Sequence, residues 1–273
     1  MDNEKIIYTG LGTESFLFDE SEDYDLGFPS ELLPISKENV PAIYDQSKRL
    51  IGLVVQYKEM MMMYACAAKE MRTRFEVLNS EFSLRTSRNP IKFINTRLKR
   101  SSSLVEKMER LGTPLSIENI EANINDVAGI RVICSYVDDI YMIAQALIRQ
   151  NDIELISQKD YIANPKPNGY RSLHMIVRVP VHFEGGTKHV KVEVQIRTIA
   201  MDFWATLEHE LKYKNQFADG DKIANELMEC ANIISDADEK MLAIRKWTEE
   251  NSTERTEEDL LIEKIKKLDL PID

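Results

Sequence analysis

This sequence lacks the long apolar run and the leader that a membrane or secreted protein carries. Among its 273 residues the longest unbroken apolar stretch is 60–68, about half of what a membrane-spanning helix needs. The N-terminus begins Met-Asp-Asn-Glu and has neither a basic flank nor an apolar segment, so no signal peptide is expected. We therefore expect a cytoplasmic protein with no membrane partner.

Cysteine, glycine and proline are also scarce. The three cysteines, Cys66, Cys134 and Cys230, lie 68 and 96 residues apart, which fits neither a disulfide framework nor a close-spaced metal site. Only 10 glycines and 9 prolines occur while 43% of the residues are hydrophobic, which excludes collagen-like and wholly disordered chains. The composition indicates a folded protein of one or two domains in a reducing compartment.

Negative charge is concentrated at the two ends of the chain. The net charge is −11, of which residues 1–35 carry −8 and residues 249–273 carry −5, so residues 36–248 carry +2. We expect a disordered or partner-facing acidic leader over 1–35 and a charged tail over 249–273, on either side of one folded domain at 36–248. Residues 85–110 hold eight basic and two acidic residues. This basic stretch predicts a site for an anion.

Hydrophobic periodicity predicts an α/β fold with a β-hairpin near its centre. Two alternating runs flank the Gly-Gly turn at 185–186, and their apolar residues share one face of the hairpin. The opposite face carries four polar side chains, His174, Glu193, Gln195 and Arg197. The other expected elements are one or two helices over about 41–79, an extended segment over 90–100, a helix opened by a capping box at Ser103 and Glu106, a buried strand within 125–136, and helices over 138–150, 198–213 and 221–247.

These residues alone suggest a site for polyphosphate and a divalent metal. Arginine and lysine neutralise phosphate, and Mg²⁺ takes one or two carboxylates together with phosphate oxygens. Asp126 precedes a glycine turn, and Glu193 lies on the polar face of the hairpin. The alternatives stay open, because a basic stretch is often only a solvated face and Asp126 could cap a turn.

Three ordered segments carry a more specific signal. Residues 126–131 read Asp-Val-Ala-Gly-Ile-Arg, residues 159–174 run from Lys-Asp-Tyr-Ile to Tyr-Arg-Ser-Leu-His, and residues 193–198 read Glu-Val-Gln-Ile-Arg-Thr, followed by Met-Asp-Phe-Trp at 201–204. Together they resemble the synthetase domain of the RelA/SpoT family, over about residues 40–245. The resemblance implies a nucleotidyltransferase-like α/β (α+β) domain with a mixed, largely antiparallel sheet flanked by helices, and further helices at both ends.

The resemblance also implies an activity, GTP pyrophosphokinase. Such an alarmone synthetase transfers pyrophosphate from ATP to the 3′-hydroxyl of GTP or GDP, giving pppGpp or ppGpp and AMP in the stringent response. None of the four histidines is followed by aspartate, so the family's hydrolase domain has no counterpart here. A stand-alone small synthetase without hydrolase activity is expected, and the wording of 164–169 and 201–204 favours the RelP-like branch over the RelQ-like one. The family's small members imply a homotetramer.

Two alternatives remain beside this function. The same chemistry could act on adenine nucleotides or on a tRNA 3′ end, or the chain could be a catalytically silent nucleotide sensor or RNA-binding homologue. Intact Asp126 and Glu193 argue against a silent protein. No DNA partner is expected, and RNA binding is left open.

Site residues carry over from the family position by position. Glu193 would be the general base, and Asp126 would hold Mg²⁺ with help from Glu193. ATP would be bound by Arg97, Lys99, Ser103, Lys107, Arg110 and Arg131. GTP or GDP would be bound by Lys159, Lys166, Asn168, Tyr170, His174, Gln195 and Asp202. Four further residues either bind nucleotide or brace the site, namely Arg197, Trp204, Glu208 and His209.

Overall fold

The computed structural model describes residues 40–86, 88–214 and 220–251. The chain divides into two compact units, residues 1–52 and 53–273, and only residues 40–52 of the first are described. Apart from the first residues of the helix that begins at Val40, the description below concerns the second unit. The expected leader at 1–35 and all but the first three residues of the expected tail at 249–273 lie outside the described residues.

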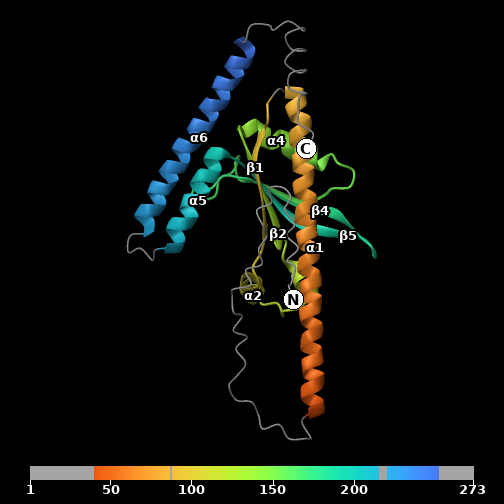
Figure 1. Cartoon of the computed structure of the whole chain (residues 1–273). Coiled ribbons are helices and arrows are strands. Elements are labelled where there is room, and N and C mark those ends of the chain that lie inside the picture. Colours follow the sequence, from red (N-terminus) through yellow and green to blue (C-terminus); the bar gives the residue numbers. More distant parts are fainter. Residues whose placement is uncertain (1–39, 87, 215–219, 252–273) are drawn as a thin grey trace, which may run out of the picture. The chain divides into compact units, whose positions relative to one another are not determined.

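Six helices and five strands make up the described part of the chain (Figure 1). The helices are α1 (Val40–Thr86), α2 (Ser101–Arg110), α3 (Ile117–Asn123), α4 (Val137–Ile148), α5 (Ile199–Lys214) and α6 (Gly220–Asn251). The strands are β1 (Ile91–Leu98), β2 (Ala128–Cys134), β3 (Glu154–Asp160), β4 (Leu173–Phe183) and β5 (Gly186–Thr198). No helix in these ranges combines the length and hydrophobicity needed to span a bilayer.

The described strands form one sheet in the order β1-β2-β5-β4-β3. Strands β2 and β5 pair in parallel, and the other three pairings are antiparallel. The predicted mixed, largely antiparallel sheet is therefore confirmed. The predicted hairpin is confirmed as well, since β4 and β5 pair from Leu173 with Ile196 to Phe183 with Gly186.

The sheet has an apolar face and a polar face. Met71 and Phe75 of α1, Ile140 of α4, and Val192 and Ile196 of β5 are fully buried members of one hydrophobic core. Side chains alternate between the faces of a strand, so Glu193 and Gln195, which alternate with the core residues of β5, lie on the opposite face. The core thus forms on the face that α1 and α4 cover, and the polar residues of the hairpin gather on the other face.

Some predicted elements differ in the structure. Helix α2 begins at Ser101 with Arg100 as its N-cap and no side-chain capping bond, so the capping box at Ser103 and Glu106 is wrong. Lys99 N donates to Val127 O at 2.9 Å, so the pairing of β1 with the chain before β2 extends to two residues before α2. The sequence analysis missed β3 and the seven-residue α3, while α1 continues past residue 79 as one helix of 47 residues.

Candidate active site

Strand register aligns the predicted site residues in a row across the sheet. Arg97 pairs with Gly129, which lies beside Glu193, and Arg131 lies beside Gln195. Gln195 pairs with His174, and His174 pairs with Lys159. Because cross-strand partners share a face of the sheet, the side chains of all five strands contribute to one polar wall.

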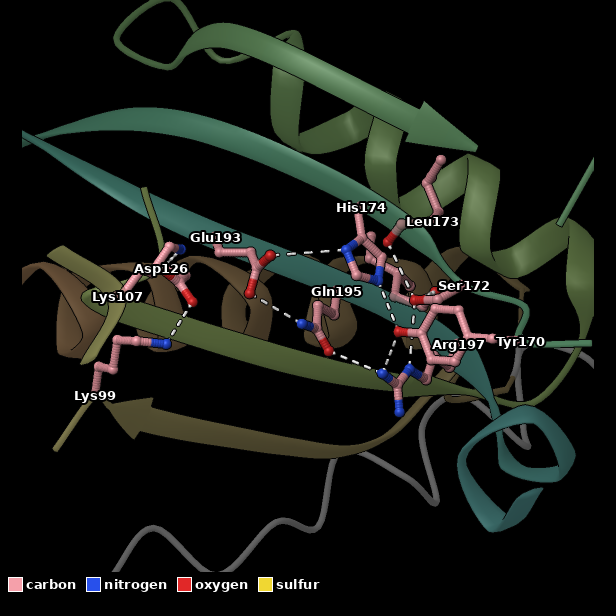
Figure 2. Close-up of polar contacts among 11 residues, drawn as sticks. Lys99, Lys107, Asp126, Tyr170, Ser172, Leu173, His174, Glu193, Gln195 and Arg197 are labelled. Carbon is pink, nitrogen blue, oxygen red and sulfur yellow. Dashed lines mark hydrogen bonds and ion pairs between the residues drawn. The ribbon is translucent and has the colours of Figure 1, made fainter. Parts of the chain in front are cut away.

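At one end of the wall, two lysines hold a carboxylate. Lys99, directly after β1, donates to Asp126 Oδ2 at 2.9 Å, and Lys107 of α2 donates to Asp126 Oδ1 at 2.6 Å (Figure 2). Burial raises the pKa of Asp126, but the bonds from Lys107 and Lys99 outweigh it, so the pKa lies below its ordinary value. We call these three residues the Asp126 cluster. Its carboxylate is ionised at neutral pH.

Glu193 lies at the centre of the wall and is also ionised. Its Oε2 accepts from Gln195 Nε2 at 2.9 Å, and its Oε1 lies 3.7 Å from His174 Nδ1. Burial raises the pKa of Glu193, but His174 and Gln195 outweigh it and hold the pKa below its ordinary value. The negative charge of Asp126 acts in the opposite direction, which indicates that the two carboxylates are neighbours.

Five side chains form a closed ring, which we call the polar ring: Glu193, Gln195, Arg197, Tyr170 and His174 (Figure 2). Four of its contacts are hydrogen bonds, and the fifth is the 3.7 Å contact between His174 Nδ1 and Glu193 Oε1. Arg197 Nη2 donates to Tyr170 Oη and to Gln195 Oε1, the latter at 2.9 Å. Tyr170 Oη lies 2.7 Å from His174 Nε2. Because Tyr170 Oη accepts from Arg197, its own proton is available to His174 Nε2. Each member of the ring thereby fixes the orientation of the next.

Arg197 connects the polar ring to two further residues of the site. Its side chain is only 5% exposed, and its Nε donates to Ser172 Oγ at 3.3 Å. Its Nη1 donates to Asp202 Oδ1 at 3.2 Å. Arg197 thus bonds to four side chains, Ser172, Asp202, Tyr170 and Gln195.

Asp202 and Arg131, predicted to bind different nucleotides, contact each other. Arg131 Nη1 lies 3.3 Å from Asp202 Oδ1, the same oxygen that accepts from Arg197. Burial and then the charge of Arg197 lower the pKa of Arg131, although Asp202 acts against them. Arg131 Nε is buried and has no hydrogen-bond partner in the described part of the chain. The two guanidinium groups share one carboxylate, so this part of the wall favours an additional anion.

The 161–170 loop presents aromatic rings beside the polar ring. Lys166 Nζ lies 4.6 Å from the ring centres of both Tyr161 and Tyr170. Asn168 Oδ1 accepts from Tyr170 N at 3.3 Å, and Asn168 Nδ2 donates to Glu208 Oε1 at 2.9 Å. The side chain of Asn168 therefore holds the loop, and Glu208 braces it. The sequence analysis missed Tyr161, although it lies in the 159–174 segment and its aromatic side chain was the available signal.

The remaining predicted residues lie at the edges of the wall. Arg97 of β1 and Lys159 of β3 are exposed at opposite edges of the sheet. Ser103 lies on α2 about one turn before Lys107, and Arg110 is exposed in the last turn of the same helix. Trp204 is buried and donates to Leu227 O at 2.9 Å, which makes it a brace, whereas His209 is exposed.

Two carboxylates of the wall are candidate metal ligands. No group of three or more histidine, cysteine or acidic side chains that could hold a metal occurs among the residues that the structure describes. Asp126 and Glu193 are ionised neighbours, and Mg²⁺ is typically held by one or two carboxylates plus phosphate oxygens and water. The donor set therefore fits Mg²⁺ bound jointly with a phosphate compound.

Known proteins share the part of the chain that builds this wall. A family model described as a region found in RelA / SpoT proteins matches residues 96–218. GTP pyrophosphokinase YwaC of Bacillus subtilis is 41% identical over 190 residues, which are 70% of this chain and 90% of that protein. The chain belongs to the RelA/SpoT family. GTP pyrophosphokinase YjbM of the same organism is 37% identical over 191 residues, 70% of this chain and 89% of YjbM.

Solved structures of RelA/SpoT-family synthetases have the same fold. Small alarmone synthetase 1 from Bacillus subtilis, bound to its product pppGpp, matches with a TM-score of 0.64 at 36% identity, covering 70% of this chain and 97% of that one. Small alarmone synthetase 2 from the same organism matches with a TM-score of 0.63 at 41% identity, covering 70% and 98%. These matches do not separate the RelP-like branch from the RelQ-like one.

Proposed function

We propose that this chain is a GTP pyrophosphokinase. It transfers pyrophosphate from ATP to the 3′-hydroxyl of GTP or GDP and forms pppGpp or ppGpp and AMP. The observation that carries this function is the polar wall itself, where an ionised Glu193 held by the polar ring lies beside the Asp126 cluster. Relatives named GTP pyrophosphokinase share this region at 37% and 41% identity, which supports the same reaction here.

ATP would bind at the Asp126 cluster. Lys99 and Lys107 would exchange the carboxylate of Asp126 for the phosphates of ATP, because both ammonium groups already lie together there. Asp126, released from the lysines, and Glu193 would hold Mg²⁺, which offsets charge on the transferred phosphoryl group when it is bound. Arg97 and Arg131 would contact adenine, and Ser103 and Arg110 would reach the phosphate chain from α2.

Glu193 would act as the general base on the 3′-hydroxyl of the acceptor. A base must be deprotonated and held in a fixed orientation, and Glu193 has a lowered pKa, a hydrogen bond from Gln195 and a 3.7 Å contact with His174. Base catalysis of this kind is typically worth ~10²–10⁴ in rate. The rest of the rate enhancement would come from aligning two anionic nucleotides among cationic side chains.

GTP or GDP would bind between the 161–170 loop and the polar ring. The ring of Tyr170 would stack on guanine after Lys166 moves away to the phosphates, where Lys159 and His174 also act. Gln195 would support the polar ring. Asp202 would face the edge of the guanine base, and Asn168 would lie near the same edge in the loop that it holds. A cytoplasmic homotetramer completes the proposal, and exposed apolar side chains along α5 and α6, such as Phe203 and Trp247, support association of copies.

One assay tests the function. Purified protein is incubated with ATP, Mg²⁺ and GTP, and the products are separated; we expect AMP and a 3′-pyrophosphorylated guanine nucleotide in equal amounts. Offering GDP, a second ATP and tRNA as acceptors in parallel tests the alternative substrates. Release of AMP without a guanine product, or no turnover with any acceptor, would overturn the proposal.

A further inference from the structure

The 161–170 loop lies directly on helix α6. Arg171, which follows the loop, donates from Nη1 to Gly169 O at 3.1 Å and to Ala231 O of α6 at 3.3 Å. Its Nη2 donates to Asn232 Oδ1 at 3.3 Å. A single guanidinium group therefore joins the end of the loop to a helix that lies 60 residues later in the chain.

Gly169 shows how closely the loop and the helix approach. Its φ of +86° is in the left-handed region, which favours glycine. A Cβ atom at this position would lie 2.5 Å from the Cβ of Ala231 and 3.2 Å from Sδ of Met228. There is no space for a side chain between the loop backbone and α6. A displacement of α6 toward the loop therefore moves the loop.

The nucleotide-facing residues of the loop share this contact. Tyr170 packs with Trp204 of α5 and with Leu227, Ala231 and Ile234 of α6 in a second hydrophobic cluster, separate from the main core. Gly169 N donates to Lys166 O at 2.8 Å, and Lys166 N donates to Tyr170 O at 3.2 Å. These bonds couple Lys166 to Tyr170, so both follow the position of the loop on α6.

The Asp126 cluster has a different support. Lys99 and Lys107 bond to Asp126, and Lys99 N bonds to Val127 O; none of these contacts in the described part of the chain involves α6. Movement of α6 therefore affects the loop side of the wall and leaves the Asp126 cluster in place.

We propose that Arg171 is a positioning residue for the acceptor nucleotide, acting through Gly169 and helix α6 without touching the nucleotide. It fixes the 161–170 loop on α6 and so sets the position of the ring of Tyr170 and the ammonium of Lys166. This inference rests on the proposed function only in naming guanine nucleotide as the acceptor. Arg171, Ala231 and Asn232 thereby contribute to the affinity for the acceptor nucleotide.

The test compares Arg171→Ala with a matched control, Arg74→Ala. Arg74 joins α1 to the segment after α4 by two bonds to Asp152, at 2.7 and 2.9 Å, and one to Gln150 at 2.7 Å, away from the wall. Arg171→Ala is expected to raise the KM for GTP about tenfold, with the KM for ATP changed by less than about twofold, since a charged hydrogen-bond donor is lost on one side only. Arg74→Ala lowers the melting temperature but leaves the KM for GTP unchanged.

Two further variants separate positioning from general stability. Arg171→Lys keeps one charged donor and recovers part of the GTP affinity. Ala231→Leu, on α6, adds bulk where Gly169 leaves no space and gives the same selective GTP defect. If Arg171→Ala does not fold, Asn232→Ala, which removes one of the three contacts, takes its place with a smaller shift in the same direction. Equal losses for GTP and ATP in these variants, or a GTP defect of equal size in Arg74→Ala, overturn the proposal.

Direct titrations distinguish this inference from the proposed function. GDP and the ATP analogue AMPCPP are titrated into the wild type and Arg171→Ala. Selective loss of GDP binding supports the positioning role even if the wild type forms no AMP, a result that would reject the function alone. Unchanged GDP binding in Arg171→Ala overturns the positioning role whatever the activity of the wild type.

Discussion

On one side of the wall Asp126 is held by two lysines, whereas on the other side five side chains close the polar ring. The Asp126 cluster consists of ion pairs between residues at the ends of β1, α2 and β2. The polar ring is built from contacts among neighbouring strands and the 161–170 loop, and its member Arg197 is buried. The lysines can exchange one anion for another, while the ring is already satisfied within the protein. The Asp126 cluster therefore depends on charge and the polar ring on preformed geometry, and in the proposed function these are the ATP side and the acceptor side.

The largest expected effect comes from Glu193, which lies between the two sides. Glu193→Gln keeps the shape of the side chain and an acceptor for Gln195, but it cannot take the proton of the 3′-hydroxyl. Turnover should fall by ~10²–10⁴, while AMPCPP binding, measured by titration, is largely retained. Turnover within about threefold of the wild type would show that Glu193 is not the base.

The second effect, on the ATP side, tests whether Asp126 serves the metal or only the lysines. Asp126→Asn removes the carboxylate charge, so we expect a lower rate and a higher Mg²⁺ concentration at half-maximal activity. A titration of Mg²⁺ at fixed ATP and GTP measures both. If the Mg²⁺ titration curve of the variant superimposes on that of the wild type, Asp126 has no role as a metal ligand.

On the acceptor side, Tyr170 separates stacking from ring geometry. Tyr170→Ala should weaken GTP and GDP binding by roughly 5- to 150-fold, because base stacking on an aromatic ring is worth ~1–3 kcal/mol. Tyr170→Phe is the matched control, since it keeps the aromatic ring and loses only the bonds to His174 and Arg197. We expect Phe to preserve GDP affinity and to lower turnover and melting temperature. Equal loss of GDP affinity in both variants contradicts stacking.

The smallest effect is the pH dependence of stability that comes from the Asp126 cluster. The folded pKa of Asp126 lies below 3.8, its ordinary value, so its stabilising contribution is present above that value and is lost as the pH falls through the folded pKa. The difference in free energy of unfolding between the wild type and Asp126→Asn should be constant from pH 7 to about 5 and shrink in more acidic solution. Urea titrations measure it, and a difference that grows toward low pH would reverse the sign of this argument.

Alternation along the hairpin was enough to predict the polar face, because the faces of a strand depend only on the spacing of its residues. It correctly grouped His174, Glu193 and Gln195. Asp126 and the basic stretch were also noted from the residues alone, and the family resemblance gave their expected roles. The closure of the ring was not predictable, since it requires the register of β4 on β5 and the position of Tyr170 in a loop. The role of Arg197 stayed undecided for the same reason.

Contacts over long separations in sequence could not be predicted at all. Arg171 meets Ala231 across 60 residues, and Asn168 meets Glu208 across 40. Neither pair has a spacing that a helix or strand pattern would reveal. The capping box at Ser103 was wrong at the local level, since α2 begins at Ser101 with Arg100 as its N-cap.

In the proposed function, the two sides of the wall bind different nucleotides by different means. A crossed titration tests this difference most directly: AMPCPP and GDP, each with Mg²⁺, are titrated into Lys107→Gln and Tyr170→Ala. We predict that Lys107→Gln weakens AMPCPP binding by about tenfold or more and spares GDP binding, because a charged hydrogen bond to phosphate is lost on one side only. We predict the reverse selectivity for Tyr170→Ala. If either variant weakens both nucleotides to the same extent, the division of the wall into two sides is wrong.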